Sequence, residues 1–363
     1  MNVMVVFGGR SGEHEVSLMS ATSILKAINR NKYNIITVGI TKSGIWKLYE
    51  GPIDEIQSGN WENIANKAAK DGGYSTNISI LPTDEGNRIM NFGNGRIENI
   101  DVVFPVLHGP FGEDGTIQGL FEMMNIPYVG TGVLASSLAM DKAMTKKLLD
   151  LDGIPQAQYD VILFKEYKKD IEGVLDKIEL GFNYPVFVKP ANMGSSVGIT
   201  KANNRDKLKE AIELAGKYDR KVVIEEAIVG REIECSILGN DEPIASLPAE
   251  IIPSAEFYDY NDKYFAGTSK FEIPANLPEN VINEIRALSI KVYKLLDCSG
   301  LSRVDCFVEK GTNRILLNEV NTMPGFTKIS MYPKMWEATG IKYEDLIDQL
   351  IELAIERFKD RNN

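Results

Sequence analysis

The sequence predicts a multi-domain protein of α/β and α+β class that begins with a doubly wound parallel sheet. Its 363 residues exceed what one hydrophobic core usually supports. Val3 to Phe7 is a short apolar run typical of a buried parallel strand, and a glycine-rich loop, GGRSG, connects it to residues with helical spacing. This order of strand, loop and helix is how a doubly wound unit opens. Residues 301–321 instead have the pattern of a β-hairpin, so antiparallel sheet is expected later in the chain.

The elements of the first third follow from the same patterns. The helix after the first loop has Leu18, Ala21, Ile24, Leu25 and Ile28 on one face. The strands expected next are residues 35–40, 45–49 and 102–107, with a helix at 113–125. Residues 52–96 are polar and rich in Asn and Gly, and they predict little beyond surface elements.

The two histidines of the chain, His14 and His108, lie in loops just beyond predicted strands. The second loop, HGPFGEDG, is again rich in glycine. Ligands meet doubly wound sheets at the carboxyl ends of their strands, which favours one shared cleft. Turn residues that cap helix N-termini are an equally good reading of either histidine.

A central segment with a second glycine-rich loop follows the linker Gly130–Gly132. A helix is expected over residues 133–151 and contains Lys142. Later elements are a strand at 161–164, a helix at 166–180, a strand at 184–189 and a strand at 199–201. The loop PANMGSSVG lies between the last two strands, and its backbone N–H groups can fold over phosphates although it is no P-loop. Lys189, at the end of the strand before this loop, can reach the same phosphates. A lysine at a strand end is more often a surface residue, but the glycine-rich loop beside it favours a function here.

The next part of the chain contains a strand that can bind a nucleotide base and a loop typical of an active-site lid. A strand at 222–225 ends in Glu225 and Glu226, where backbone amides beside an acidic side chain can bind adenine and ribose. Residues 232–238 and 243–250 are expected to be paired strands. The stretch EFYDYNDKY, residues 256–264, has no clear period and is typical of an active-site lid. Helices are expected at 279–296 and at 343–359, the latter as a packing element.

The hairpin near the end carries the strongest chemical pattern. Side chains two apart on a strand share a face, so Arg303 and Asp305 point together, as do Glu319 and Asn321. Three oxygen donors beside one arginine suit Mg²⁺ that bridges phosphates, and the arginine would offset charge on a transferred group. Each pair alone is common on solvated strand faces. Taken together, followed by the turn Met323-Pro324-Gly325, they favour a magnesium–nucleotide site.

Composition excludes several classes of protein. A net charge of −11 argues against a nucleic-acid partner. No apolar run is as long as a membrane span, and the N-terminus lacks the pattern of a signal peptide. Three scattered cysteines predict a cytoplasmic setting without disulfides, and a structural zinc site is not expected.

Seven motifs in order resemble the D-alanine–D-alanine ligases of the ATP-grasp superfamily over nearly the whole chain. They are FGGRSGEHEVSL, HGPFGEDGTIQG, MDKAMTKKLL, VKPANMGSSVG, EFYDYNDKY, SRVDCFVE and LNEVNTMPGFTKISMYP. The resemblance implies an N-terminal domain (residues 1–130), a central ATP-grasp domain (131–224) and a C-terminal ATP-grasp domain (225–363), with ATP between two antiparallel sheets. The last domain would carry the magnesium site and the lid.

The resemblance also implies roles for individual residues. ATP would be bound by Lys142, Lys189, Ser195, Ser196, Glu225, Glu226, Ile228 and Glu232. Two Mg²⁺ ions, or Mn²⁺ in their place, would be held by Asp305, Glu319 and Asn321. Arg303 and the backbone of Gly325 correspond to the pair that stabilises an oxyanion. The first D-alanine would meet Glu13 and His108, the second would meet Ser330 and Met331, and Lys263 would be a further substrate-binding residue. Glu13, Ser195 and Tyr264 resemble a hydrogen-bonded set that joins the lid to the site, and Ser330 is counted with the catalytic residues.

The activity implied is ATP-dependent synthesis of D-alanyl-D-alanine through a D-alanyl phosphate, for peptidoglycan precursors, by a cytoplasmic homodimer. A D-serine ligase of the same family is an alternative, since the Lys263-Tyr264 pair excludes only the depsipeptide formers. Other ATP-grasp carboxylate–amine ligases, and a non-catalytic nucleotide-binding module, are the remaining alternatives. The base for the attacking amine is not assigned by the sequence.

Overall fold

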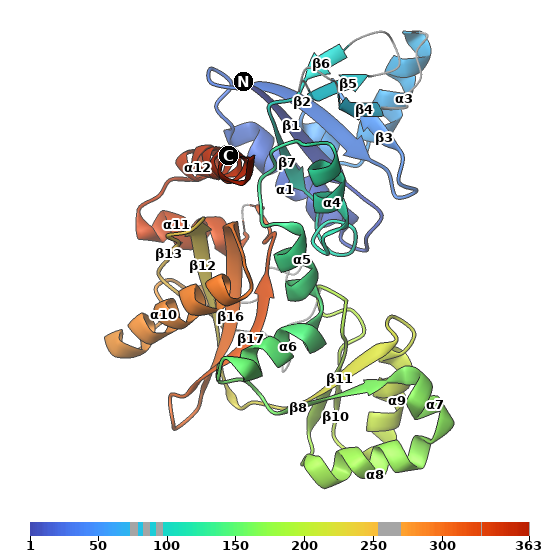
Figure 1. The fold of residues 1–363 in the computed structure, drawn as a ribbon, viewed down its shortest axis with the longest axis vertical. Coiled ribbons are helices and arrows are strands. Elements are labelled where there is room, and N and C mark those ends of the chain that lie inside the picture. Colours follow the sequence, from blue (N-terminus) through green and yellow to red (C-terminus); the bar gives the residue numbers. More distant parts are fainter. Residues whose placement is uncertain (73–78, 83–87, 92–96, 253–269, 328, 363) are drawn as a thin grey trace.

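The computed structural model describes the whole chain except residues 73–78, 83–87, 92–96, 253–269, 328 and 363. Four sheets organise the described residues: a mainly parallel sheet near the N-terminus, a small three-stranded sheet, and two antiparallel sheets. Figure 1 shows the N-terminal sheet at one end, the sheet that contains β12, β16 and β17 in the middle, and the sheet that contains β8 to β11 at the other end.

The N-terminal sheet is doubly wound, as predicted. Its order is β3-β2-β1-β7, and β1 (Asn2–Gly8) pairs in parallel with β2 (Asn34–Ile40) and β7 (Val102–Val106). Only β3 (Trp46–Leu48), at the edge, is antiparallel. Val3, Val5 and Phe7 face the core that contains α1 (His14–Ala27), while Met4 and Val6 face the core that contains α4 (Thr116–Met123). Both faces of the sheet are therefore covered, which explains the continuous apolar run in β1.

Residues 52–99 hold more structure than predicted. They form α2 (Asp54–Gln57), α3 (Trp61–Asp71) and an antiparallel sheet of β4 (Ser79–Pro82), β5 (Arg88–Asn91) and β6 (Ile97–Asn99). The Trp61 side chain is buried, its ring 5.0 Å from that of Phe7, and a side chain at Gly39 would collide with it. The sequence did not predict α3, because its buried residues besides Trp61 are alanines, Ala65 and Ala69.

Two predicted helices are each divided by an aspartate. The helix expected at 133–151 is α5 (Val133–Met140) followed by α6 (Lys142–Leu151), because Asp141 is extended and its carboxylate accepts the Met144 N–H at 3.2 Å. Asp170 likewise separates α7 (Phe164–Lys169) from α8 (Ile171–Gly181) and accepts the Gly173 N–H at 3.0 Å. An N-cap aspartate competes with continuation of the helix, and periodicity alone does not reveal it.

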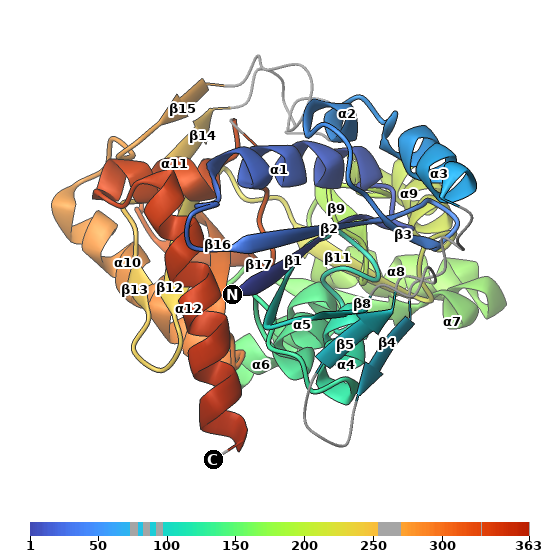
Figure 2. The same cartoon turned by 90° about the horizontal axis from the view of Figure 1, so that it is seen from above.

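The central sheet is antiparallel throughout. Its order is β10 (Thr200–Ala202), β9 (Val186–Pro190), β11 (Lys221–Glu226) and β8 (Tyr159–Leu163). Side chains of α8 and of α9 (Arg205–Ala215), a helix that was not predicted, form a core with these strands. Viewed from above, α7, α8 and α9 lie on the opposite side of the molecule from α10 and α12 (Figure 2).

The large antiparallel sheet contains the predicted hairpin. Its order is β15 (Lys270–Glu272), β14 (Ala249–Ile252), β12 (Gly230–Gly239), β16 (Gly300–Glu309) and β17 (Ile315–Asn321). A sixth strand, β13 (Ile244–Ala245), pairs with β12, and α10 (Glu279–Leu295) and α11 (Met331–Thr339) lie beside the sheet. The strand expected at 243–250 is thus two strands, because Leu247 and Pro248 interrupt the pairing with β12. Side chains of α10 share a core with one face of β12 and β16, so their other face is left to the site.

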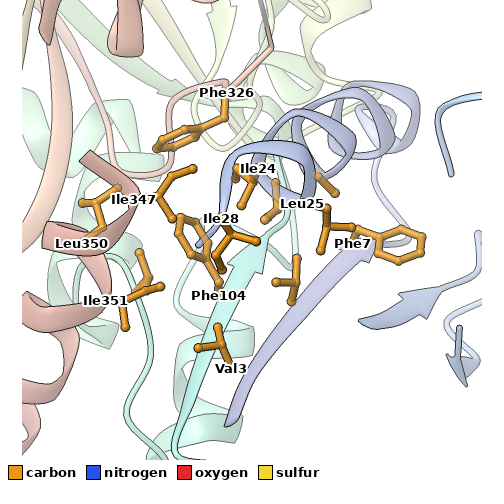
Figure 3. Packing of buried hydrophobic residues seen from close by; sticks show 14 of the residues in the cluster. Val3, Phe7, Ile24, Leu25, Ile28, Phe104, Phe326, Ile347, Leu350 and Ile351 are labelled. Atoms are coloured by element: carbon orange, nitrogen blue, oxygen red, sulfur yellow. The ribbon is translucent and has the colours of Figure 1, made fainter. Parts of the chain in front are cut away.

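The last helix, α12 (Tyr343–Asn362), packs against the N-terminal part of the chain. Figure 3 shows Ile347, Leu350 and Ile351 beside Val3 and Phe104. The guanidinium of Arg357 donates to the carbonyl of Gly130, and to Ser299 Oγ at 2.8 Å. One core therefore joins the two ends of the sequence. Among the helices that the structure describes, none combines the length and apolar character needed to cross a membrane.

Candidate active site

Two clefts meet at Glu319, which lines both. The domain cleft lies where the N-terminal part, the loop of residues 190–198 and the hairpin come together, and it encloses about 960 Å³ including open solvent. The sheet cleft lies between the two antiparallel sheets and encloses about 1200 Å³. Of the predicted residues, the domain cleft is lined by Glu13, His108, Lys142, Ser195, Arg303, Glu319, Asn321, Gly325, Ser330 and Met331. The sheet cleft is lined by Lys189, Ser196, Glu225, Glu226, Ile228, Glu232 and Glu319.

The hairpin face has the predicted arrangement. Across β16 and β17, Arg303 pairs with Asn321 and Asp305 pairs with Glu319. Arg303 Nε and Nη2 each donate to one oxygen of Asp305 at 2.7 Å, and Asn321 Nδ2 donates to Asp305 Oδ2 at 3.0 Å. Asp305 is buried beneath these partners and does not line either cleft, whereas Glu319 and Asn321 do.

Glu234 belongs to this face and was missed. It lies on β12 opposite Asp305, is buried, and its Oε2 is 3.3 Å from Arg303 Nε. The signal was the alternation Glu232-x-Glu234, which puts both carboxylates on the face that holds Arg303.

The donor set on the hairpin suits Mg²⁺. It offers two carboxylates and one amide oxygen, which are hard ligands. Within the described ranges, no group of three or more His, Cys, Asp or Glu side chains is placed to form a metal cage. Mg²⁺ usually takes one or two carboxylates and completes its shell with substrate phosphates and water, so these residues fit that ion.

Glu13 lines the domain cleft at a tightly packed position. It directly precedes α1, is buried, and accepts a hydrogen bond from Ser195 Oγ in the loop of residues 190–198. Gly109 has a φ of +72°, which favours glycine, and a Cβ atom there would lie 2.3 Å from Glu13 Oε2 and displace that carboxylate. Ser195 and Ser196 have φ values of 50° and 61°, a left-handed conformation that bends this loop toward the N-terminal part. Two of the three members predicted for this set therefore meet; Tyr264 and its neighbour Lys263 lie outside the described residues.

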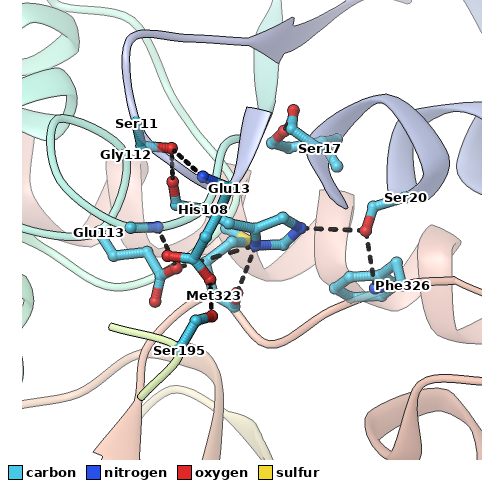
Figure 4. Close-up of polar contacts among 12 residues, drawn as sticks. Ser11, Glu13, Ser17, Ser20, His108, Gly112, Glu113, Ser195, Met323 and Phe326 are labelled. Atoms are coloured by element: carbon cyan, nitrogen blue, oxygen red, sulfur yellow. Dashed lines mark hydrogen bonds and ion pairs between the residues drawn. The ribbon is translucent and has the colours of Figure 1, made fainter. Parts of the chain in front are cut away.

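His108 lines the domain cleft, but both of its ring nitrogens have partners in the protein. Nε2 lies 3.0 Å from Ser20 Oγ, and Nδ1 lies 3.0 Å from the carbonyl oxygen of Met323 (Figure 4). Burial lowers the pKa of His108 to about 4, so the ring is neutral at pH 7. The other histidine, His14, has Nδ1 2.7 Å from the Gly9 carbonyl oxygen, in keeping with the turn-residue reading.

Glu113 is a further residue of this cleft that the sequence reasoning missed. Its Oε1 accepts the Gly109 N–H at 2.7 Å and lies 3.8 Å from His108 Nδ1. Burial raises the pKa of Glu113 well above its usual value, and the nearby charge of Glu13 raises it further. Its position in the same glycine-rich loop as His108 was the available signal.

The sheet cleft contains a buried group of opposite charges. Lys189 Nζ donates to Glu225 Oε2 at 2.8 Å, and Lys146 Nζ lies 3.4 Å from Glu225 Oε1. Burial alone would raise the pKa of Glu225, but the two lysines outweigh it and the pKa is lowered. Burial lowers the pKa of Lys146. Burial would also lower the pKa of Lys189, but Glu225 outweighs it, so the pKa of Lys189 is raised. Lys146 was missed, although it lies four residues after Lys142 and so on the same helix face.

Lys142 and Lys189 lie in different clefts. Lys142 Nζ donates to the Met193 carbonyl at 2.7 Å and lies 3.7 Å from Glu319 Oε2. Glu226 accepts the N–H of Gln158 at 2.7 Å, so its side chain also supports the strand beside it. Gly325 has no room for a side chain, because a Cβ there would lie 2.7 Å from Ser330 Oγ.

Comparisons with known proteins agree over the full length. The family described as D-ala D-ala ligase N-terminus matches residues 2–131, and D-ala D-ala ligase C-terminus matches residues 148–352. A D-alanine–D-alanine ligase from Acetivibrio thermocellus is 56% identical over 99% of this chain and 96% of its own. The chain belongs to the D-alanine–D-alanine ligase family. Another ligase of that name, from Thermoanaerobacter pseudethanolicus, is 52% identical over 99% of this chain and 98% of its own.

Solved structures share the fold of this D-alanine–D-alanine ligase family member. A D-Ala:D-Ser ligase from Enterococcus faecalis superposes with a TM-score of 0.85 at 39% identity, covering 97% of this chain and 99% of its own. A D-alanine–D-alanine ligase from Coxiella burnetii gives a TM-score of 0.84 at 36% identity, and the superposition covers 100% of this chain and 96% of that ligase. The predicted fold class, a doubly wound domain followed by an ATP-grasp unit with two antiparallel sheets, is confirmed.

Proposed function

We propose that this protein joins two D-alanines to D-alanyl-D-alanine with ATP, as a step in peptidoglycan precursor synthesis. Its membership of the D-alanine–D-alanine ligase family supports this. The observation that carries the proposal is the meeting of the two clefts at Glu319, with Arg303 and Gly325 on the domain-cleft side. A nucleotide in the sheet cleft would then present its terminal phosphate to a carboxylate in the domain cleft.

The reaction has two steps. The carboxylate of the first D-alanine, whose ammonium pairs with Glu13, attacks the γ-phosphorus of ATP and gives D-alanyl phosphate and ADP. The amine of the second D-alanine then attacks the acyl carbon, and phosphate leaves from the tetrahedral intermediate. Arg303 and the Gly325 N–H would stabilise the oxyanion that forms. Ser330 and Met331 would line the subsite of the second D-alanine.

ATP would occupy the sheet cleft. Glu225 and the backbone from Glu226 to Ile228 would bind adenine, and Glu232 the ribose. Lys189 and Ser196 would meet the phosphates from this cleft, and Lys142 and Ser195 from the domain cleft. Lys263 and Tyr264, in the segment beyond the described residues, would complete the cover that excludes water from the acyl phosphate.

Two Mg²⁺ ions, or Mn²⁺ ions, would be held by Asp305, Glu319 and Asn321 together with the phosphates, and would neutralise phosphate charge. A crystal grown with Mn²⁺ and a non-hydrolysable ATP analogue tests this, because Mn²⁺ gives an anomalous signal. We expect the peaks beside Glu319 and Asn321. Peaks away from the hairpin would contradict the assignment.

We further propose three domains, residues 1–130, 131–224 and 225–363, in a cytoplasmic homodimer. The linker at Gly130–Gly132 and the two antiparallel sheets support the division, although β11 continues to Glu226. Sedimentation velocity of the purified protein tests the dimer.

The function is tested by measuring phosphate release and dipeptide formation with ATP, Mg²⁺ and D-alanine. We expect D-alanyl-D-alanine with one phosphate per dipeptide, and no depsipeptide when D-lactate is added. ATP binding without phosphate release on any D-amino acid would favour a non-catalytic module. Turnover only with other carboxylates and amines would favour a different ATP-grasp ligase.

A D-alanine–D-serine ligase is the second candidate, because a solved structure of that activity shares the fold at 39% identity. Relatives above 50% identity bear the D-alanine–D-alanine name, and they favour D-alanine. Competition between D-alanine and D-serine for the second position separates the two. Dipeptide that contains mostly D-serine at equal concentrations would overturn the first proposal.

A further inference from the structure

We propose that Ser20 is a positioning residue for the loop that carries Gly325, and that it acts through His108. The inference deepens the proposed function and rests on it, because Gly325 N–H is the oxyanion donor there. Ser20 lies on α1, in the N-terminal part, whereas the loop of residues 322–327 follows β17 near the other end of the sequence.

Three hydrogen bonds connect helix and loop. The Phe326 N–H donates to Ser20 Oγ at 3.2 Å, Ser20 Oγ lies 3.0 Å from His108 Nε2, and His108 Nδ1 lies 3.0 Å from the Met323 carbonyl oxygen (Figure 4). A backbone N–H only donates and a carbonyl only accepts. The hydroxyl proton of Ser20 therefore goes to Nε2, and the ring proton is on Nδ1. One neutral tautomer satisfies every group.

The two ends of this chain of hydrogen bonds are at residues 323 and 326, one on each side of Pro324-Gly325. Ser20 and Phe326 are fully buried, and His108 and Met323 nearly so, which leaves these bonds protected from solvent. The Phe326 carbonyl accepts a further hydrogen bond from Tyr343 Oη at 2.9 Å, and the Phe326 ring packs 6.0 Å from that of Phe104. The peptide plane of Gly325 is thus held from both sides.

His108 is accordingly occupied by the protein rather than available to donate to substrate. With both ring nitrogens engaged, its contribution to the reaction is the direction in which the loop holds the Gly325 N–H. An oxyanion donor stabilises a transition state only when its direction is fixed beforehand, so a loosened loop should slow the chemical steps and leave ATP binding unchanged.

The experiment compares Ser20→Ala with Ser23→Ala, a control on the same helix whose Oγ donates only to the Met19 carbonyl, at 3.1 Å. The sequence contains a single Pro-Gly pair, residues 324 and 325. Labelling proline carbonyls with ¹³C and glycine amides with ¹⁵N therefore isolates one NMR signal, that of the Gly325 N–H. The same preparations are assayed for kcat and for KM of ATP.

We expect Ser20→Ala to displace or broaden the Gly325 signal and to lower kcat about 10- to 100-fold, with KM for ATP within about twofold of wild type. Ser23→Ala should change neither. Ser20→Cys, which has similar volume and a weak S–H donor, should lie between the two, and it replaces Ser20→Ala in the test should the alanine variant not fold.

An unmoved Gly325 signal, or wild-type kcat in Ser20→Ala, would overturn the inference. So would a loss of kcat matched by Ser23→Ala. A wild-type protein that makes no dipeptide would instead overturn the proposed function; the Gly325 signal would still report whether Ser20 holds the loop.

Discussion

The sheet cleft and the domain cleft differ in how one part of each is held: Lys189 by an ion pair in the first, and the loop of residues 322–327 by neutral hydrogen bonds in the second. Beside the sheet cleft, Lys189 and Lys146 are paired with Glu225, so a nucleotide bound as proposed would have to take Lys189 from an existing ion pair. In the domain cleft, the loop of residues 322–327 donates a neutral hydrogen bond to Ser20 through the Phe326 N–H, and His108 Nδ1 lies 3.0 Å from the Met323 carbonyl oxygen. Exchange of partners suits a substrate that binds and leaves, whereas fixed donors suit charge that exists only in the transition state.

The largest expected effect is the loss of kcat when Arg303, in the domain cleft, is replaced. Arg303→Ala should lower kcat about 1000-fold, since it would remove the charge proposed to stabilise the oxyanion. Arg314→Ala, an exposed position on the same hairpin, should leave kcat unchanged. Initial rates of phosphate release measure both. Were Arg303→Ala to raise only KM for ATP, the assignment of Arg303 to the chemical step would be wrong.

A second prediction tests whether His108, in the domain cleft, is neutral. The folded pKa of His108 is about 4, below the ordinary value of 6.5, so an unfolded chain takes up a proton first as the pH falls. The stabilisation that this provides is complete above pH 6.5 and is lost as the pH falls toward 4, by about 3 kcal/mol in all. Urea unfolding between about pH 7 and about pH 5 measures this slope.

His108→Gln is the reference for that slope. It has no group that titrates in this range, so its stability should fall less steeply with decreasing pH than that of the wild type, whatever its stability at neutral pH. Equal slopes for the two proteins would mean that His108 is not held neutral by burial.

The third prediction concerns the sheet cleft. Lys146→Met should raise KM for ATP about tenfold and leave KM for D-alanine unchanged, because Glu225 would then retain Lys189 more tightly when the phosphates arrive. Lys147→Met, an exposed neighbour on the same helix, is the matched control. A rise in KM for D-alanine alone would contradict the division of roles between the clefts.

The smallest effect is expected at Glu226. Its carboxylate accepts the Gln158 N–H, so Glu226→Ala should cost a few tenths to about 1 kcal/mol of stability. KM for ATP should change by about threefold or less, because the backbone here, not the side chain, would meet the base. Thermal unfolding and initial rates measure the two. A larger change in KM would assign the carboxylate itself to the nucleotide.

The features that the sequence predicted well depend on the repeat of side chains along a single strand or helix. The hairpin face followed from alternation along two strands. Of the two histidines expected in one cleft from loops at the carboxyl ends of parallel strands, His108 lines the domain cleft and His14 does not. The family resemblance added residues whose pattern alone was weak, such as Glu232.

The features that sequence missed depend on partners far along the chain or on a single competing contact. Glu113 and Lys146 matter because burial and distant charges act on them. The breaks at Asp141 and Asp170 come from one capping hydrogen bond each. Trp61 is buried because Gly39, on another strand, leaves room for its ring.

The position of α12 bears on how the chain acquires its structure during synthesis. The core beneath β1 is completed by Ile347, Leu350 and Ile351, which follow β1 by most of the sequence. During synthesis the sheet that contains β1 therefore keeps part of its apolar surface uncovered until α12 has been made.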